Sequence, residues 1–317
     1  MARLDDAEAR GRTAVRAVLD AVPRSAPVVV AVSGGTDSLA LAACAAFVAS
    51  RDPVDVTALV VDHGLQAGSD EVAARAVAQV RGLGLRATST RVQVGTDGGP
   101  EAAARAARRE ALLRAAGPRG VVLLAHTLDD QAETVLLGLG RGSGPRSIAG
   151  MRRVDRPWLR PFLDLRRTDT ERICAVHGLE PWQDPHNTDP SYRRVRVRRE
   201  ALPLLEDVLD GGVAAALART ADQVRADADL LDRLATDATT DHVPALAALD
   251  PALRTRVLRR LALAAGAAAG ELSARHVAAL DRLVVDRRGG RTVELPGGVT
   301  ASRRGERLVL APTPVAR

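Results

Sequence analysis

Three short apolar runs and a fourth, more polar segment predicted as a strand, each followed by a segment with helical spacing of apolar residues, organise the first half of the chain. Runs rich in β-branched residues predict buried strands, and apolar residues three and four positions apart predict amphipathic helices. The predicted strands cover residues 28–32, 54–61, 85–94 and 121–125, and the predicted helices cover 3–20, 39–48, 69–82, 101–116 and 128–139. Alternating strands and helices predict an α/β fold with a doubly wound, mostly parallel, Rossmann-like sheet.

The second half has a different pattern, in which helical segments rich in Ala, Leu and Arg are followed by short apolar runs. These segments and runs cover residues 206–240, 245–285, 291–295, 298–303 and 307–310. A chain of 317 residues is long enough for one large and one smaller hydrophobic core. We therefore predict an N-terminal domain over residues 1–205 and a smaller helical and α+β domain over residues 206–317.

A polar hexapeptide with two glycines joins the first predicted strand to the next helix. Its residues are Ser33, Gly34, Gly35, Thr36, Asp37 and Ser38. Glycine lets the backbone approach a ligand closely, and free amides at a helix start attract phosphate. A carboxylate beside phosphates needs a cation between them, so Asp37 is a candidate Mg²⁺ ligand. The alternative is that Thr36 or Asp37 only caps the helix.

Polar residues also follow the second and fourth predicted strands. They are Asp62 and His63 after the second strand, and His126, Asp129, Asp130 and Glu133 after the fourth. Parallel sheets bind ligands beyond the carboxyl ends of their strands, so we expect one shared site. The three acids lie broadly on one side of a helix, and His126 suits an acid, a base or a phosphate contact. The alternatives are acids that suit the helix dipole and histidines with structural roles.

Positive charge is concentrated in one stretch of the chain. The net charge is +6 and all 45 basic residues are arginine; residues 141–199 hold 14 of them against 7 acids. The densest run, residues 193–199, places Arg194 and Arg198 one helical turn apart. Guanidinium groups suit phosphates, so this stretch predicts a polyanion-binding surface. The alternative is a solvated arginine face. Arg141 and Gly142 begin a basic, glycine-rich turn that suits either a phosphate or a flexible connection.

Cysteine usage and hydropathy exclude several classes of protein. Cys44 and Cys174 lie far apart and form no CxxC pair, which argues against a zinc knuckle or a cysteine-ligated iron–sulfur cluster. We expect both to be buried thiols in a reducing cytoplasm. The N-terminus has no signal-peptide pattern and no apolar run reaches transmembrane length, so the expected location is cytoplasmic, without a membrane partner.

The motifs together resemble one known family. The hexapeptide SGGTDS resembles the SGGxDS loop of the N-type ATP pyrophosphatases, the PP-loop superfamily. The pieces that agree further are VDHGL at 61–65, EAAAR at 101–105 with Arg108, HTLDDQAET at 126–134, RGSG at 141–144, RPFL at 160–163, and DPHNTD at 184–189 with Arg194 and Arg198. In this order and spacing they resemble the tRNA(Ile)-lysidine synthase family over about residues 25–200. Arg109, His186 and Val195 depart from the pattern, which bears on packing and RNA contacts more than on phosphate chemistry.

The resemblance implies a two-step ligation that uses ATP and Mg²⁺. The wobble cytidine of a tRNA(Ile) with a CAU anticodon attacks ATP through its O2 and releases pyrophosphate. The amine of free L-lysine then attacks C2, which expels AMP and leaves lysidine. A homodimer is compatible with this reading.

The resemblance also assigns roles to residues of this chain. The catalytic residues would be Asp37, His126, Asp130 and Arg194. ATP would be bound by residues 33–38, Asp62, His63, Arg141 and Gly142, with Mg²⁺ at Asp37. Lysine would be bound by Asp129, Asp130 and Glu133, and tRNA by Arg105, Arg108, Arg193, Arg194, Arg196 and Arg198.

Other functions stay open at this point. A tRNA thiolation enzyme of the same superfamily would keep the phosphate loop but needs reactive cysteines or a cluster. A glutamine-dependent ligase would need a hydrolysing part, for which no nucleophile is visible. A non-catalytic nucleotide- or RNA-binding module would need the arginine-rich stretch but not the acidic helix start beside the loop.

Overall fold

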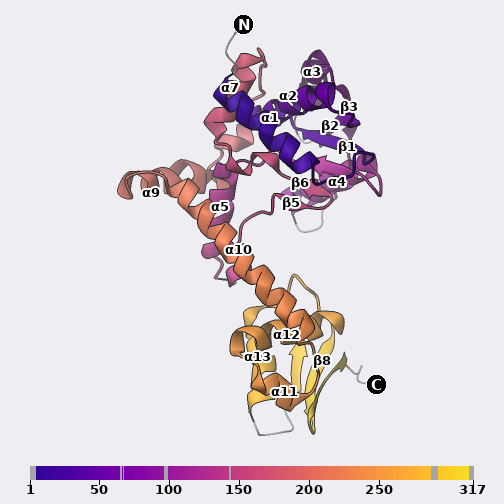
Figure 1. Cartoon of the computed structure of the whole chain (residues 1–317), viewed down its shortest axis with the longest axis vertical. Coiled ribbons are helices and arrows are strands. Elements are labelled where there is room, and N and C mark those ends of the chain that lie inside the picture. The colour runs from indigo at the N-terminus through magenta and orange to yellow at the C-terminus, as the bar shows by residue number, and fades with distance from the viewer. Residues whose placement is uncertain are drawn as a thin grey trace. The chain divides into compact units, whose positions relative to one another are not determined.

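The computed structural model describes residues 5–64, 66, 68–95, 99–142, 144–286 and 292–313 (Figure 1). These residues form two compact units. The first holds the residues up to Leu137 together with Met151–Ala218, and the second holds Gly138–Gly150 together with the residues from Arg219 onward. The first unit thus reaches beyond residue 205, and the division into domains 1–205 and 206–317 stays a prediction.

A six-stranded sheet forms the centre of the first unit, with the strand order β3-β2-β1-β4-β6-β5. The strands are β1 (Val28–Val32), β2 (Val56–Asp62), β3 (Arg86–Arg91), β4 (Val121–Leu123), β5 (Val154–Asp155) and β6 (Trp158–Leu159). Neighbouring strands are parallel except β5 and β6. The predicted α/β fold with a mostly parallel sheet is confirmed. The hydrophobic pattern does not predict β5 and β6, because strands this short show no alternation.

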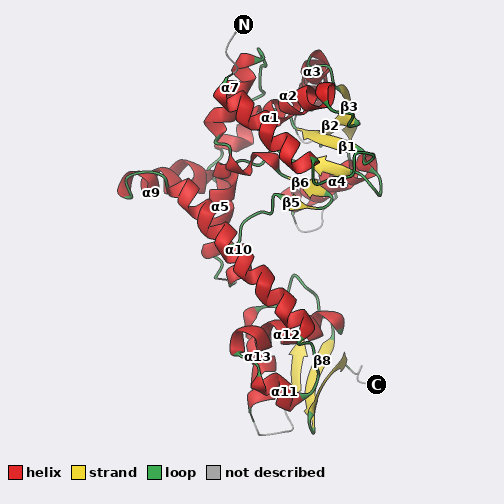
Figure 2. Cartoon of the chain, viewed as in Figure 1, coloured by secondary structure: helices red, strands yellow, loops and turns green. Residues whose placement is uncertain are grey.

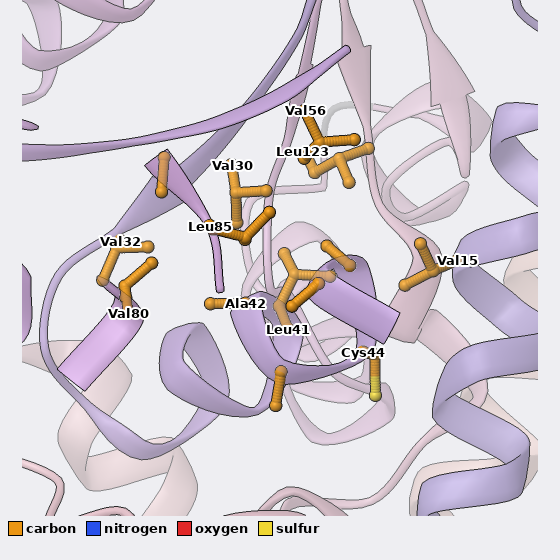
Figure 3. Close-up of a cluster of buried hydrophobic side chains, with 14 of the residues drawn as sticks. Val15, Val30, Val32, Leu41, Ala42, Cys44, Val56, Val80, Leu85 and Leu123 are labelled. Atoms are coloured by element: carbon orange, nitrogen blue, oxygen red, sulfur yellow. The ribbon is translucent and has the colours of Figure 1, made fainter. Parts of the chain in front are cut away.

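Different helices cover the two faces of this sheet. Alternate residues of a strand point to opposite faces, so Val28, Val30 and Val32 of β1 pack on one side and Val29 packs on the other. The helices on the first side, whose core is shown in Figure 3, are α1 (Asp6–Leu19), α2 (Thr36–Arg51), α3 (Ser69–Gly82) and α7 (Arg167–Val176). On the second side lies α4 (Pro100–Ala116). Both faces are therefore covered around β1 and β4, whereas most side chains of β3 are exposed.

The winding of the sheet reverses at β1, which lies between β2 and β4. In open α/β sheets the crevice at this point, outside the carboxyl ends of the strands, is where ligands bind. The helix after β1 begins at Thr36, three residues earlier than its apolar spacing predicts. Asp37 and Ser38 therefore belong to the first turn of α2, and only residues 33–35 form the loop.

The remaining elements of the first unit are mostly short helices, of which the 3-10 helix Pro185–Thr188 and the π-helical turn contribute residues to this crevice. They are α5 (Leu128–Leu139), whose last two residues fall in the second unit, the 3-10 helices Pro161–Asp164 and Pro185–Thr188, α8 (Arg193–Arg196), a π-helical turn (Val197–Ala201), α9 (Leu202–Val208) and the start of α10 (Val213–Asp237). A small apolar cluster of Ala132, Leu202 and Ala214 holds α5, α9 and α10 together. Arginine-rich residues after Tyr192 are thereby brought beside the acidic start of α5.

The second unit combines helices with a small antiparallel sheet (Figure 2). Its elements are α6 (Pro145–Ile148), the later part of α10, α11 (Val243–Ala248), α12 (Pro251–Ala264), α13 (Ala274–Val285), β7 (Thr292–Leu295), β8 (Val299–Arg304) and β9 (Arg307–Pro312). The three strands follow the order β7-β8-β9 and confirm the predicted runs. The helical segment predicted over 245–285 divides into three helices, with Pro251 at the start of α12. Within the described ranges, no helix is long and apolar enough to cross a bilayer.

Candidate active site

A cavity of about 690 Å³ opens at the carboxyl ends of β1, β2 and β4. Its walls combine the three strand ends with residues from α4, α7 and the chain that follows α7. The predicted site residues among them are Ser33, Gly35, Thr36, Asp37, Ser38, Asp62, His63, Arg108, His126 and Arg198. The sheet topology thus brings polar clusters that are far apart in the sequence to one cavity.

A glycine and a serine hydroxyl shape the loop between β1 and α2. Gly34 has a φ of 84°, which residues with a side chain rarely adopt. The Ser38 hydroxyl donates to the Gly35 carbonyl at 2.9 Å and accepts from the Ser33 amide at 3.1 Å. Gly35 is the N-cap of α2 and has no side chain to cap the helix, and its own amide donates to the Ser33 hydroxyl at a long 3.5 Å. The amides of the first turn of α2 can therefore donate to an anion. An N-cap role for either of the next two residues is excluded, because both lie inside the first turn.

Asp37 lines the cavity and is held by two residues of α7. Thr170 Oγ1 donates to Asp37 Oδ1 at 2.5 Å, and Arg167 Nε lies 3.6 Å from Asp37 Oδ2. Burial, and to a smaller extent the negative charge of Asp130, raise the pKa of the Asp37 carboxyl. The hydrogen bond from Thr170 and the positive charge of Arg167 act to lower this pKa but do not outweigh burial. A cation beside this carboxylate would stabilise its ionised form.

Asp62 and His63 lie at the end of β2 and have different surroundings. Asp62 is buried, and its Oδ1 accepts the Gly64 amide at 2.8 Å. Burial acts to raise the pKa of Asp62, but the hydrogen bonds from Gly64 and the Ser69 hydroxyl and the charge of Arg91 outweigh it, so the pKa is lowered. Asp62 therefore stabilises its own turn. The ring of His63 lines the cavity, and its Nδ1 is buried without a hydrogen-bond partner in the described part of the chain.

His126 and Arg108 lie in the same wall of the cavity. Burial lowers the pKa of His126 to about 4. The positive charges of Arg160, Arg108 and Arg194 lower this pKa further, whereas the negative charge of Asp130 acts to raise it. The imidazole is therefore neutral at pH 7. Burial also lowers the pKa of Arg108. Among the described residues neither His126 Nδ1 nor Arg108 Nε has a hydrogen-bond partner. Arg108 thus faces the cavity, and its predicted role in tRNA binding stays a prediction.

The acidic start of α5 is occupied by arginines. Asp129 Oδ2 accepts the Arg167 amide at 2.8 Å, and its Oδ1 lies 3.1 Å from Arg166 Nη2. Asp130 Oδ2 accepts the Thr127 amide at 2.9 Å, while its Oδ1 lies 3.4 Å from Arg167 Nη2 and 3.3 Å from Arg198 Nη2. Burial acts to raise the pKa of Asp130, but the Thr127 amide and the neighbouring cations outweigh it, so the pKa is lowered and the carboxylate is ionised at neutral pH.

Glu133 is the anchor of the arginine-rich stretch. Its side chain has no exposed surface. Arg198 Nε donates to Glu133 Oε1 at 2.6 Å, and Arg194 Nε lies 3.1 Å from Oε2. Arg194 and Arg198 share one face, as predicted, but that face points inward. A lysine amine could reach Glu133 only by displacing an arginine, which differs from the expectation of direct binding.

The other predicted arginines have different positions. Arg105, Arg193 and Arg196 are exposed, and Arg196 Nη2 donates to Glu200 Oε2 at 2.8 Å. Arg141 and Gly142 belong to the second compact unit and are absent from the described residues that line this cavity. Leu65 and Ser143, which are part of the motifs, lie outside the described residues.

Two family models and several relatives match the chain. A PP-loop domain matches residues 10–205, and a TilS substrate binding domain matches residues 242–309. The tRNA(Ile)-lysidine synthase of Thermobifida fusca is 53% identical over 307 residues, which cover 93% of this chain and 94% of that protein. That of Streptomyces coelicolor is 50% identical over 303 residues, which cover 91% and 86%. The chain belongs to the tRNA(Ile)-lysidine synthase family.

A solved structure outside this family shares the fold. A tRNA thiolase of Methanococcus maripaludis, described with its 4Fe-4S cluster, has a TM-score of 0.58 at 18% identity. The match covers 69% of this chain and 79% of that one. This likeness supports the α/β fold alone. The resemblance seen in the motifs of residues 25–200 therefore identified both the family and its fold.

The cavity suits a cation that is shared with phosphates. Among the described residues, no group of three or more His, Cys, Asp or Glu is arranged to hold a metal alone. Mg²⁺ in nucleotide sites is held by one or two carboxylates and completed by phosphate oxygens and water. Asp37, with its raised pKa, its position at the phosphate loop and Asp130 nearby, fits that donor set.

Three residues at the start of α7 belong to the site but are not predicted by the motifs. Arg166 contacts Asp129, Arg167 contacts Asp37 and Asp130, and Thr170 contacts Asp37. A signal for them exists in the sequence. Two adjacent arginines at a helix start oppose the helix dipole, which favours acids there. Such a pair indicates carboxylates from elsewhere in the chain.

We expect the stability of the chain to depend on His126 at acid pH. Its pKa is about 4 in the folded chain against 6.5 for the free side chain, so between these values the unfolded chain binds more protons. The free energy of unfolding therefore falls as pH drops through this window, with a slope approaching about 1.4 kcal/mol per pH unit for one proton. His126→Gln should remove this slope. Urea denaturation followed by tryptophan fluorescence measures it, since both tryptophans lie in the first unit.

The control is His242→Gln, which changes an exposed histidine of the second unit and should leave the slope intact. An unchanged slope in His126→Gln would show that this imidazole is not held neutral by the fold.

Proposed function

We propose that this cavity carries out both steps of lysidine formation. The chain is an ATP-dependent ligase that joins lysine to C2 of the wobble cytidine of tRNA(Ile) with a CAU anticodon, by way of an adenylated cytidine. The observation that carries this proposal is the position of Arg167. Its side chain lies 3.6 Å from Asp37 and 3.4 Å from Asp130. The start of α2, next to the phosphate loop, and the acidic start of α5 are therefore close enough for one arginine side chain to contact both.

In the first step the α2 amides and the Ser33 hydroxyl bind the phosphates, and Asp37 holds the Mg²⁺ that accompanies ATP. Mg²⁺ supplies neutralisation of the charge that develops on the phosphate oxygens. Neutral His63 and His126 each present a ring to the cavity, and an imidazole N–H there donates to a phosphate oxygen. The cytidine O2 forms a bond to the α-phosphorus while the bond to the pyrophosphate oxygen breaks.

In the second step Asp130 and Asp129 attract the ammonium group of lysine. Asp130 is ionised and lies between Arg167 and Arg198, two arginines that line the cavity. Once a lysine amine has lost a proton, its nitrogen attacks C2 of the adenylated base and the bond to the AMP oxygen breaks. Glu133 supports this step indirectly, because it fixes Arg194 and Arg198 beside the acids.

The tRNA contacts the enzyme through exposed arginines and through the second unit. Arg105, Arg193 and Arg196 are exposed on the first unit and suit backbone phosphates. The TilS substrate binding domain over residues 242–309 supports a role of the second unit in tRNA binding. A homodimer and a cytoplasmic location remain predictions from the sequence.

Two rival functions have less support. Thiolation needs a reactive thiol, but burial raises the pKa of Cys44 to about 12 and that of Cys174 to about 12, so neither forms a thiolate at neutral pH. A non-catalytic binding module has no use for ionised carboxylates beside a phosphate loop. Ligation accounts for both groups in one cavity.

Incubation with ATP, Mg²⁺, labelled lysine and a panel of tRNA transcripts tests the function. Label is expected in tRNA(Ile) with a CAU anticodon and not in the same tRNA with the wobble cytidine changed to uridine. Without lysine, pyrophosphate should still be released while AMP stays on the tRNA. Failure to release pyrophosphate with this tRNA would overturn the proposed reaction.

Asp130→Asn is expected to raise the KM for lysine about tenfold or more and to change the KM for ATP much less. The loss of one carboxylate charge removes an ion pair with the amine, whereas the asparagine oxygen still accepts the Thr127 amide. Steady-state kinetics with each substrate varied in turn measure both constants. Asp207→Asn, on an exposed acid of α9, is the control. Equal effects on both constants would argue against amine recognition by Asp130.

A further inference from the structure

One face of α7 lies against the first turn of α2. Residues 167, 170 and 174 share this face because they are three, four and seven positions apart. Arg167 reaches Asp37, and Cys174 Sγ lies 3.3 Å from the Thr36 carbonyl oxygen. Between them, Thr170 Oγ1 lies 2.5 Å from Asp37 Oδ1. α7 therefore supports the start of α2 from behind the cavity.

Thr170 carries a buried hydroxyl on this face of α7. Its exposed fraction is 0%. A buried hydroxyl costs stability unless it is hydrogen-bonded, and a helical threonine commonly finds a partner in its own helix. Thr170 has such a partner in the Arg167 carbonyl at 2.7 Å. Its one proton can serve only one acceptor at a time, and an ionised carboxylate is the stronger acceptor.

We propose that Thr170 is a positioning residue for the Asp37 carboxylate in the nucleotide step. Its hydroxyl holds Oδ1, which fixes the side-chain torsion of Asp37 and would keep the carboxylate in place for the cation that accompanies ATP. Arg167 contacts the other oxygen of the same carboxylate, with its Nε 3.6 Å from Asp37 Oδ2. The assignment rests on the proposed function only in that the cavity binds ATP with Mg²⁺.

Three variants of the full chain test this role. Thr170→Val removes the hydroxyl and keeps the shape, Thr170→Ser keeps the hydroxyl, and Thr168→Val changes an exposed threonine of the same helix. Calorimetry of ATP binding with and without Mg²⁺ gives the factor by which Mg²⁺ strengthens binding. Thermal denaturation followed by tryptophan fluorescence reports on the fold of the first unit.

Thr170→Val should lower the Mg²⁺ factor about tenfold, as expected for a lost hydrogen bond to a charged group, and leave ATP binding without Mg²⁺ unchanged. Thr170→Ser and Thr168→Val should keep the factor within about twofold of the original chain. Should Thr170→Val fail to fold, Thr170→Ala provides the same comparison with Thr170→Ser. The proposal is overturned if folded Thr170→Val keeps the full Mg²⁺ factor, or if Thr170→Ser loses as much as Thr170→Val.

The lysine-labelling experiment with the unaltered chain is independent of these variants. Lysidine formation by the unaltered chain together with a normal Mg²⁺ factor in Thr170→Val would reject the positioning role alone. Absence of ATP binding in the unaltered chain would reject the proposed function and the positioning role together.

Discussion

Asp37→Asn is expected to lower the rate of cytidine adenylation by on the order of a hundredfold or more. The substitution keeps the size of the side chain and its acceptor for the Thr170 hydroxyl, but it removes the negative charge that holds the cation against the phosphates. tRNA binding should not change, because the exposed arginines are untouched. Pyrophosphate release with ATP and tRNA, in the absence of lysine, measures this step by itself.

Asp70→Asn is the matched control for this variant. Asp70 is the second residue of α3, as Asp37 is of α2, but it is exposed. Its substitution should leave adenylation unchanged. A similar rate in both variants would mean that Asp37 only stabilises the start of its helix and takes no part in the reaction.

The hydrophobic pattern predicts most of the fold because the central strands of the sheet are buried. Strands β1 and β4 are continuous apolar runs, and β2 contains the apolar run 58–61, so each of these strands is visible without knowledge of its partners. The phosphate loop is equally local, since a strand, two glycines and a helix start follow one another in the sequence. Their common cavity then follows from the rule for parallel sheets.

The partners of the charged residues could not be predicted, because they depend on contacts between distant segments. Arg194 and Arg198 were expected to share a face, and they do, but which way that face points depends on Glu133, 65 positions before Arg198. A run of arginines has the same sequence pattern whether it meets RNA or a buried carboxylate. The burial of Glu133 decides between the two, and no local pattern encodes it.

Trp158 illustrates the same limit. An aromatic residue near an arginine-rich stretch suits stacking on an unpaired base as well as core packing. In the folded chain Trp158 is buried in β6, and the Arg109 guanidinium lies 4.2 Å from the centre of its ring. Arg109 stands where the family pattern has an aromatic residue. Here its guanidinium packs on the Trp158 ring through a cation–π contact. This pairing depends on how α4 packs against β6, which no single segment specifies.

Glu133→Gln is expected to lower the free energy of unfolding of the first unit by about 3 kcal/mol. The variant leaves two arginines without the buried carboxylate that they share, and removing one member of a buried ion pair costs more than the pair itself contributes. Urea denaturation followed by tryptophan fluorescence measures the change. Glu200→Gln, which affects an exposed pair with Arg196 in the same stretch, should leave the unfolding midpoint within experimental error.

The same stretch then separates the two arginines that pair with Glu133 from the exposed arginines that we propose to contact tRNA. Phosphate contacts release counterions, so each contact that is lost should lower the salt dependence of tRNA binding by about one unit of slope. Arg193→Ala with Arg196→Ala should reduce the slope and leave the unfolding midpoint nearly unchanged, because both side chains are exposed. Arg194→Ala with Arg198→Ala should do the opposite, since buried Glu133 then loses its two close cations and keeps Arg167 Nη2 at 4.0 Å. Equal slopes in the two double variants would contradict the inward orientation of Arg194 and Arg198 and return them to the tRNA surface.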